Sequence, residues 1–286
     1  MKVLVTGATG FLGRHIVGYL KSLDGIEIIT SSIDELDLIK FPWIQNTKYI
    51  QANIYSTNTN WFEFFQQPDK LIHLAWKGLP NYKGLFHFTE NLFYDFAFLE
   101  NLIQQGLKDL TVTGTCFEYG LQEGCLSEEM QTMPDNPYAI AKDTLRKMLF
   151  QLQKNKSFHL KWVRLFYMYG EGQSPNSILS QLDKALENKE AVFNMSGGEQ
   201  IRDYQPVEEM AKNIVVIALQ NKITGIINNC SGKGIKIIDL VKNHLVKQNK
   251  EIQLNLGFYP YPDFEPFQFW GNNDKLVRIH KTYEKN

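Results

Sequence analysis

The sequence predicts an α/β protein whose core is a doubly wound parallel sheet, and two observations carry that prediction. Short apolar runs rich in β-branched residues alternate along the chain with longer amphipathic stretches of helical period. The short runs are continuously apolar, as in strands that helices cover on both faces. With 286 residues, the chain is long enough for one large unit of this class or for two average domains.

Strand and helix signals follow one another in the order that such a sheet requires. An apolar run at residues 3–5 is followed by a helical pattern at 11–23. Further helical patterns lie at 86–103 and after Pro137. The other predicted strands lie at 27–29, 71–75, 110–112 and 162–165.

The character of the sequence changes near residue 170. Beyond it Gly, Pro, Asn and short strand signals predominate, and an aromatic, proline-rich segment lies at 258–270. We expect residues 1–170 to form the sheet domain and residues 171–286 to form mainly a smaller cap over the carboxyl ends of its strands. A helix near 206–220 is expected to return to the sheet domain.

Composition excludes several classes of protein. The 30 Lys and Arg residues nearly balance the 31 Asp and Glu residues, so no charge excess predicts binding to nucleic acid or to a membrane surface. No apolar run approaches the length of a membrane span, and the start, MKVLVTG, is unlike a secretory signal. Three irregularly spaced cysteines predict neither a disulfide framework nor a metal site. These features indicate a protein of the reducing cytoplasm.

The stretch at 86–103 is unusually aromatic. Phe88, Leu92 and Phe96 belong to one helical stripe, whereas Phe93 and Phe98 lie outside it. A helix that is apolar on two sides is buried on two sides. It is either simply core or, with the helix after Pro137, the interface of a homodimer, and we expect a homodimer.

A glycine loop follows the first predicted strand directly and opens the first helix. Gly7, Gly10 and Gly13 recur three residues apart, with Thr9 between the first two. Glycines at this spacing let the backbone turn tightly and approach a pyrophosphate, which then lies at the positive end of the helix. The loop predicts that residues 1–170 bind a dinucleotide in the Rossmann manner.

The end of the second strand bears on which dinucleotide binds. An NAD site usually places Asp or Glu there for the ribose 2′-hydroxyl, but this strand ends in Ser31 and Ser32. Arg14 and the two serine hydroxyls could instead meet a 2′-phosphate, unless Arg14 simply lies on the solvent face of its helix. The sequence therefore favours NADP(H), with NAD(H) as the alternative.

Tyr138 and Lys142 form a Tyr-x-x-x-Lys pair at the start of the helix after Pro137. The spacing of four places both side chains on one face of that helix. An ammonium beside a phenol lowers the phenol's pKa, so Tyr138 could exchange a proton with a sugar or alcohol oxygen. Thr115 ends a predicted strand and offers a hydroxyl at the same edge of the sheet.

Ordered motifs along the whole chain resemble the extended short-chain dehydrogenase/reductase family, in its nucleotide-sugar epimerase/dehydratase branch. The motifs are GATGFLG at 7–13, His-Leu-Ala at 73–75, the Thr115 segment ending in Tyr-Gly, Tyr138 with Lys142, VRLFYMYG at 163–170 and Arg-Asp-Tyr at 202–204. The phrase HLAWKGLPNY at 73–82 resembles bacterial reductases of nucleotide-activated 4-keto-6-deoxysugars.

The resemblance implies a role for each matching residue. Tyr138 would be the acid/base, Lys142 would bind the nicotinamide ribose, and Thr115 would hydrogen-bond the reacting oxygen. The implied cofactor residues are Gly7, Thr9, Gly10, Phe11, Leu12, Gly13, Arg14, Ser31, Ser32, Asn53, Ile54, Leu74, Ala75, Trp76, Asn91, Tyr138 and Lys142. The implied substrate residues are Thr115, Cys116, Phe117, Asn176 and Arg202, with Arg202 on the diphosphate unless it is a surface arginine paired with Asp203 or Glu199.

The chain also departs from the family pattern. Dehydratases of the branch carry an Asp-Glu pair after the threonine, where this chain has Cys116 and Phe117, so a dehydratase is not expected. Asn53 replaces an Asp near the adenine, and Tyr167 replaces an Asn that contacts substrate. His73 is interpreted as a packing residue.

These features lead to one expected reaction and two rivals. We expect NADPH-dependent reduction of the C4 ketone of a nucleotide-activated 4-keto-6-deoxysugar, with dTDP as one candidate for the nucleotide. The product would be used in the synthesis of a surface polysaccharide such as lipopolysaccharide. The first rival is a nucleotide-sugar 4-epimerase that retains its cofactor. The second is a non-catalytic NADP-binding regulator, against which the intact set of Thr115, Tyr138 and Lys142 argues.

Overall fold

Seven parallel strands form the central sheet of the computed structural model, which describes residues 1–56, 60–261 and 265–284. The strand order is β12-β7-β5-β4-β1-β2-β3. From β1 the chain first builds the sheet outward on one side through β2 and β3, then returns to the other side of β1 and continues from β4 to β12. The strands are β1 (Lys2–Thr6), β2 (Glu27–Ser32), β3 (Lys48–Gln51), β4 (Lys70–His73), β5 (Asp109–Thr115), β7 (His159–Leu165) and β12 (Gly225–Asn229). This confirms the predicted doubly wound sheet.

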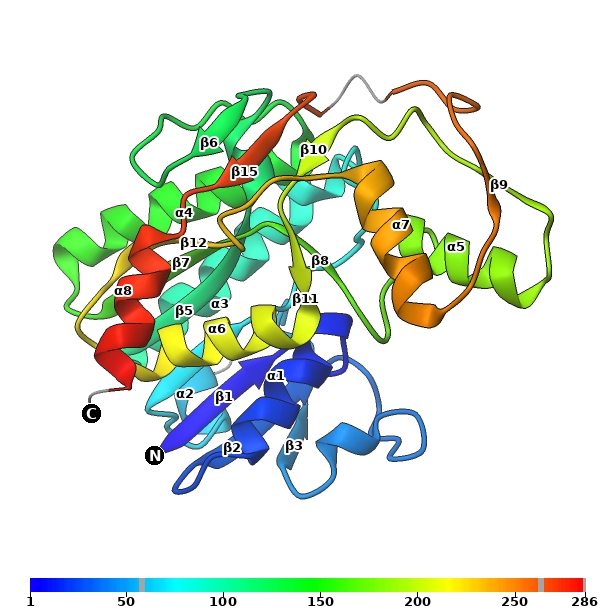
Figure 1. Ribbon diagram of the computed structural model, residues 1–286. Helices are drawn as coiled ribbons and strands as arrows, with labels where there is room; N and C mark the ends of the chain where they lie inside the picture. The colour runs from blue at the N-terminus through cyan, green and yellow to red at the C-terminus, as the bar shows by residue number, and fades with distance from the viewer. Residues whose placement is uncertain (57–59, 262–264, 285–286) are drawn as a thin grey trace.

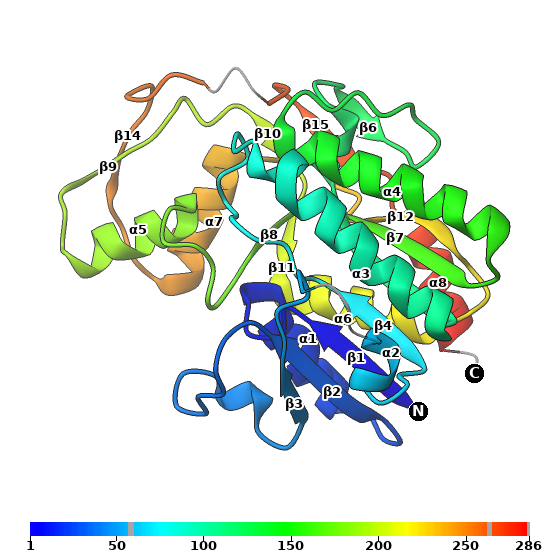
Figure 2. The same cartoon turned by 180° about the vertical axis from the view of Figure 1, so that it is seen from behind.

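Helices cover both faces of the sheet, as Figures 1 and 2 show from opposite sides. On one face lie α1 (Phe11–Lys21), α6 (Val207–Leu219) and α8 (Asp274–Tyr283), and on the other lie α2 (Trp61–Phe64), α3 (Leu92–Gln105) and α4 (Pro137–Asn155). Along β1, Val3 and Val5 enter the first core while Leu4 enters the second. This alternation explains why the strand is continuously apolar.

The cap holds a third apolar core of its own, formed mainly by α5 (Ile178–Glu187) and α7 (Ile237–Gln248). Four pairs of short strands lie outside the main sheet among the described residues; two of them join segments of the cap and two join the cap range to residues before 170. In Figure 1 the cap lies beyond the carboxyl end of β1. The pairs are β9 (Val192–Asn194) with β14 (Gln253–Asn255), β10 (Ile201–Arg202) with β13 (Ile235–Lys236), β8 (Tyr167–Tyr169) with β11 (Tyr204–Pro206), and β6 (Gly124–Leu126) with β15 (Phe269–Gly271).

The predicted division at residue 170 is too simple. The helix expected near 206–220 is α6 and packs against α1, as predicted. In addition, β12 is a strand of the main sheet and α8 packs on α6 and β12, although both were assigned to the cap. Their apolar side chains, such as Ile227 and Ile279, complete the core over β1, and no local signal distinguishes them from cap residues.

The aromatic stretch at 86–103 begins with a π-helical turn, η2 (His87–Asn91), and continues as α3. Phe98 is buried in the core beneath α3, but Phe93 is 61% exposed. Of the two alternatives for this stretch, burial in the core of this chain is therefore wrong for Phe93, and the homodimer interface stays a prediction. Among the helices of the described residues, none is long and apolar enough to cross a lipid bilayer.

Candidate active site

A cleft of about 550 Å³ opens at the carboxyl ends of β1, β4 and β5, where the strand order reverses. Ligands of doubly wound sheets bind at this point because the loops diverge there. The cleft is lined by predicted site residues from four segments: Gly7, Gly10, Phe11, Leu12, Gly13, Leu74, Trp76, Thr115, Cys116, Phe117, Tyr138 and Lys142. The structure thus brings the glycine loop and the catalytic set into one site.

The glycine loop has the tight geometry that its sequence predicts. Gly7 has φ +71°, and a Cβ there would lie 2.8 Å from the backbone nitrogen of Ala75. A Cβ on Gly13 would lie 2.4 Å from the carbonyl oxygen of Gly7. Helix α1 begins after Gly10 with no side-chain cap and no acidic residue in its first turn. Its first amides therefore suit a pyrophosphate, and the residues present fit a dinucleotide.

An acid lies beside the end of β2, contrary to the premise that favoured NADP(H). Asp34 Oδ2 accepts hydrogen bonds from Thr9 Oγ1 at 2.6 Å and from Ser32 Oγ at 2.9 Å. The bond from Thr9 is the main reason that the pKa of Asp34 lies below its ordinary value. The loop after β2 folds back toward the glycine loop. We looked for an acid at the end of β2 itself, and Asp34 lies two residues beyond that end.

Arg14 does not have the free guanidinium that the sequence argument gave it. Its Nη2 lies 2.5 Å from the Glu171 carboxylate, and its Cζ lies 5.1 Å from the ring centre of Trp43. Trp43 in turn donates from Nε1 to the carbonyl oxygen of Ala8 at 2.9 Å. Arg14 therefore connects the first helix to the segment after β8. Ser31 is buried, and its hydroxyl has no hydrogen-bond partner within the described part of the chain.

Tyr138 stands at the start of α4, which the sequence caps efficiently. The side chain of Asn136 accepts from the backbone N–H of Ala139 at 3.0 Å, and Pro137 occupies the first turn. The Tyr138 ring packs among the rings of Trp76, Tyr82 and His87. Its side chain is buried but lines the cleft.

The electrostatics around Tyr138 differ from the prediction that Lys142 lowers its pKa. Burial raises the pKa of Tyr138, and the hydrogen bond with the Thr115 side chain opposes that shift. Lys142 Nζ donates to the carbonyl oxygen of Thr113 at 3.0 Å and lies 4.0 Å from the ring centre of Trp76. Burial lowers the pKa of Lys142 to about 8. Burial thus disfavours the phenolate of Tyr138, the opposite of the effect that the predicted pairing with Lys142 would have.

Thr115 ends β5 at the cleft and begins the short helix η3 (Cys116–Tyr119). Its Oγ1 accepts from the backbone N–H of Phe117 at 3.2 Å. Cys116 is buried, and burial raises the pKa of its thiol far above the ordinary value. Neither Cys116 nor Phe117 can therefore supply a proton in the way a carboxylic acid does.

Several predicted site residues lie outside the cleft lining. Asn91 is buried and bonded to Lys77 and Tyr55, and Ile54 packs on the second core. His73 is buried and bonded to Thr6 and Asp95, as expected of a packing residue. The other predicted residues outside the lining are Thr9, Arg14, Ser31, Ser32, Asn53, Ala75, Asn176 and Arg202.

Arg202 is buried, and its partner is neither of the two that the sequence offered. Its guanidinium lies 2.9 Å from the Glu265 carboxylate and donates to the carbonyl oxygens of Ile201 and Phe267. Its Cζ lies 4.9 Å from the ring centre of Phe269. Asp203 instead accepts from the backbone N–H groups of the loop after β12 and of β15.

The sequence reasoning missed an aromatic wall of the cleft. Tyr82 comes from the loop after β4 and packs against Phe117 and Tyr138. Tyr167 faces the cleft from β8, and its hydroxyl is buried with no hydrogen-bond partner among the described residues. The sequence had already placed Tyr167 at the position of a substrate contact. The missed lining residues are Leu79, Pro80, Tyr82, Thr113, Gly114, Leu165, Phe166, Met168, Gln173 and Ser174. Only a loop rich in Pro, Tyr and Trp at 76–82 signalled this wall.

The fold and the Thr-Tyr-Lys set beside a glycine loop define a short-chain dehydrogenase/reductase of the extended type. The chain belongs to the NAD dependent epimerase/dehydratase family, whose model matches residues 3–230. This confirms the resemblance that the sequence motifs indicated.

Two bacterial relatives match nearly the whole chain. The dTDP-6-deoxy-L-talose 4-dehydrogenase (NAD(+)) of Aggregatibacter actinomycetemcomitans is 26% identical, over 95% of this chain and 99% of its own. The GDP-6-deoxy-D-talose 4-dehydrogenase of the same organism is 24% identical, over 98% of this chain and 91% of its own.

Solved structures share the fold. A UDP-N-acetylglucosamine 4-epimerase from Methanobrevibacter ruminantium M1 matches with TM-score 0.85 and 21% identity, over 99% of this chain and 94% of its own. A UDP-glucuronic acid 4-epimerase from Bacillus cereus, with UDP-glucuronic acid and NAD bound, matches with TM-score 0.80 and 24% identity, over 98% of this chain and 93% of its own.

Proposed function

We propose that this protein reduces the C4 ketone of a nucleotide-activated 4-keto-6-deoxysugar. One observation carries the proposal: a single cleft joins the glycine loop at Gly7–Gly13 to the side chains of Thr115, Tyr138 and Lys142. A dinucleotide on the loop and a sugar over the phenol would then share one site. The resemblance of 73–82 to bacterial 4-ketosugar reductases supports the same reaction.

Each catalytic side chain has a role that its contacts support. When bound, the reduced nicotinamide supplies a hydride to the carbonyl carbon. Tyr138 gives its proton to the carbonyl oxygen, and the hydrogen bond with the Thr115 side chain favours the phenolate that remains. Thr115 Oγ1 accepts from Phe117, so its own proton can be donated, either to the Tyr138 oxygen or to the carbonyl oxygen of a bound sugar.

The cleft also supports a 6-deoxysugar as substrate. Leu79, Tyr82, Phe117 and Phe166 give it apolar walls that suit a methyl group at C6. The unpartnered hydroxyl of Tyr167 is available for a sugar hydroxyl. The two talose 4-dehydrogenase relatives act, by their names, at C4 of 6-deoxysugars. Arg202 is our candidate for the diphosphate, in exchange for its bond to Glu265.

The cofactor we infer is NAD(H), which reverses the preference drawn from the sequence. Asp34 is held against the glycine loop by Thr9 and Ser32, so a ribose 2′-phosphate would approach a carboxylate. Arg14, which was to balance that phosphate, is paired with Glu171. The first relative carries NAD(+) in its name.

Replacing Asp34 with Asn tests this inference. The change removes the negative charge but keeps the size of the side chain, so we expect the affinity for NADPH to rise about tenfold relative to NADH. Glu35→Gln removes a neighbouring exposed charge and should leave the ratio unchanged. Titration of both cofactors by fluorescence gives the ratios. A wild-type protein that prefers NADPH tenfold would overturn the inference.

Binding of the dinucleotide should weaken in alkaline solution. The pKa of Lys142 is lowered to about 8, so its ammonium loses its proton as the pH rises through that value. If Lys142 holds the nicotinamide ribose, the dissociation constant should rise by up to about tenfold between pH 7 and pH 9. Lys142→Met should abolish this dependence. An affinity that stays constant across this range in the wild type contradicts the role.

A spectroscopic assay separates the proposed reaction from its rivals. Purified protein is mixed with NADH or NADPH and a panel of dTDP- and GDP-linked 4-keto-6-deoxysugars, and absorbance is followed at 340 nm. Oxidation of the cofactor in proportion to alcohol product supports the reductase. A second panel of nucleotide-linked sugars that carry a C4 hydroxyl tests the epimerase, because a C4 ketone has no configuration to invert. Interconversion of their C4 epimers without net cofactor consumption would show the epimerase. Binding of cofactor without turnover of any sugar would show the regulator.

We also propose that the protein is a homodimer and that it serves surface polysaccharide synthesis. Phe93 and Tyr94 of α3 are 61% and 39% exposed, on the helix that packs beside α4. Large exposed apolar side chains on one helix favour a protein contact. The proposed role in surface polysaccharide synthesis rests on the product class, because deoxysugars of this class are building blocks of such polysaccharides.

A further inference from the structure

We propose that Glu118 is a positioning residue, which fixes the backbone and hydroxyl of Thr115 for the reaction proposed above and so rests on that function. Glu118 belongs to helix η3, three residues after Thr115, and its side chain is fully buried. No role is assigned to it by the sequence motifs. Its contacts connect three elements of the active site.

The Glu118 carboxylate makes direct contact with the catalytic threonine. Oε1 accepts from the backbone N–H of Thr115 at 3.0 Å, while Thr115 Oγ1 accepts from the N–H of Phe117 at 3.2 Å. The two bonds form a capping box that fixes both the backbone and the side chain of Thr115. The remaining hydrogen on Oγ1 is thereby directed to a partner outside the box, on the side of Tyr138, which lines the cleft with Thr115.

Side chains from β7 and α4 hold the carboxylate in place. Oε1 also accepts from Trp162 Nε1 at 2.9 Å, and Oε2 accepts from Arg164 Nε at 2.8 Å. Arg146 Nε lies 3.7 Å from Oε2, and Arg146 follows Lys142 by one turn of α4. Glu118 therefore connects the strand that ends in Thr115 to the helix that carries Lys142.

The chain makes room for this carboxylate at the residue before Thr115. A Cβ on Gly114 would lie 2.4 Å from Glu118 Oε1 and 2.2 Å from Trp162 Nε1. Only glycine at this position admits both groups without a shift. The close approach of Glu118 to the backbone at residue 114 therefore requires glycine at that position.

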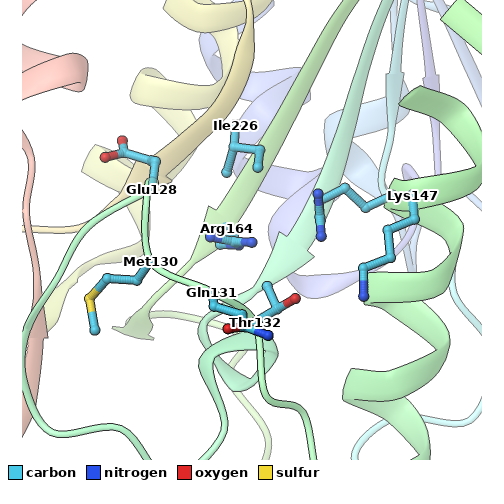
Figure 3. Close-up of a pocket in the computed structure, with 8 residues that line it drawn as sticks. Glu128, Met130, Gln131, Thr132, Lys147, Arg164 and Ile226 are labelled. Carbon is cyan, nitrogen blue, oxygen red and sulfur yellow. The ribbon is translucent and has the colours of Figure 1, made fainter. Parts of the chain in front are cut away.

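A second cavity lies behind the ion pair and shares no lining residue with the catalytic cleft. It measures about 280 Å³, and Figure 3 shows Arg164 at its centre, with Lys147 extending from α4 and Thr132 from the preceding loop. Arg164 lines this second cavity and not the catalytic cleft, so its replacement changes the ion pair without changing a residue that lines the cleft.

Two double variants that differ only at residue 118 test the proposal. Glu118→Met with Arg164→Met removes both charges and the acceptor for the Thr115 amide, and such apolar replacements of buried pairs preserve folding in other proteins. Glu118→Gln with Arg164→Met restores an amide oxygen as acceptor. We expect kcat to fall about tenfold to a hundredfold in the first variant and to recover largely in the second. Dissociation constants for the dinucleotide and KM for the sugar should stay within about twofold.

Asp109→Asn provides a matched control. Asp109 is also a buried carboxylate, ion-paired with Lys70 and Lys161, but it lies at the opposite end of the same strand, β5. Its replacement should lower stability and leave kcat unchanged. In a Thr115→Val background, the Met double variant should cause no further loss of kcat. Wild-type kcat in that double variant, an equal loss in Asp109→Asn, or an additive loss with Thr115→Val would each overturn the proposal.

Hydrogen exchange tests the same contact without any turnover. The Thr115 amide should be protected in the wild type and in the Gln double variant, and should exchange at least about tenfold faster in the Met double variant. Unchanged protection in the Met variant would overturn the positioning role, whatever the sugar. Absence of ketone reduction by the wild type would instead overturn the proposed function, so the two failures are distinguishable.

Discussion

Tyr138→Phe is expected to lower turnover about a thousandfold while dinucleotide binding remains within twofold of the wild type. The substitution removes only the phenolic oxygen, and general acid catalysis by a positioned group contributes on the order of 10²–10⁴ in rate. The ring keeps its contacts with Trp76 and Tyr82, so the cleft retains its shape. Steady-state rates at 340 nm and fluorescence titration with NADH give the two quantities.

Tyr119→Phe is a useful comparison for that experiment. Tyr119 is a buried tyrosine on η3 whose hydroxyl donates to Asn228 at 2.8 Å, and it does not line the cleft. Its loss should reduce stability by about 1 kcal/mol and leave turnover intact. If Tyr138→Phe reduced the ketone at the wild-type rate, the proton would come from elsewhere and the proposed mechanism would be wrong.

Gly13→Ala is expected to weaken dinucleotide binding on the order of a hundredfold or more, equivalent to about 3 kcal/mol. The added methyl would lie 2.4 Å from the carbonyl oxygen of Gly7 and 2.8 Å from Cα of Ala8, both backbone atoms that no side-chain rotation can move. The loop would have to open, and the amides at the start of α1 would then face away from the pyrophosphate. Equilibrium dialysis or fluorescence titration measures the loss.

Gly18→Ala in the same helix is the matched control for this substitution. A Cβ at Gly18 meets no atom within 4 Å, so the methyl extends into open space. Because Gly is a poor helix former, the change should stabilise the protein by roughly 0.5–1 kcal/mol and leave cofactor affinity unchanged. Equal affinities in the two variants would show that the glycine loop is not the dinucleotide site.

The elements that the sequence predicted well are those with strong local periodicity. The strand at β1 and the helix α6 were found near their observed bounds because their apolar patterns are continuous or strictly periodic. The glycine loop and the Tyr138–Lys142 pair were also recognisable, since each depends on spacing along the chain. Such signals lie within about ten residues of sequence and can be recognised without knowledge of the rest of the fold.

The parts that failed depend on contacts between distant segments. Asp34 belongs to the loop after β2, and its approach to Thr9 arises only when that loop folds back on the glycine loop. Likewise, the environment of Tyr138 is set by Trp76, Tyr82 and His87, which a nearby lysine does not reveal. The pKa of Tyr138 is raised and not lowered as predicted, because the effect of burial outweighs the effect of the Lys142 charge that the spacing suggested.

The amino-acid order alone determined the class of fold, the glycine loop and the Tyr-x-x-x-Lys pair, because each arises from periodicity or short spacing. Tertiary structure decided the partners: Glu265 for Arg202, Thr9 for Asp34, and the backbone N–H of Thr115 for Glu118. Charge and burial act through space over a few ångströms, and residues as far as 157 positions apart, as in the pair of Arg14 and Glu171, meet only in the folded chain.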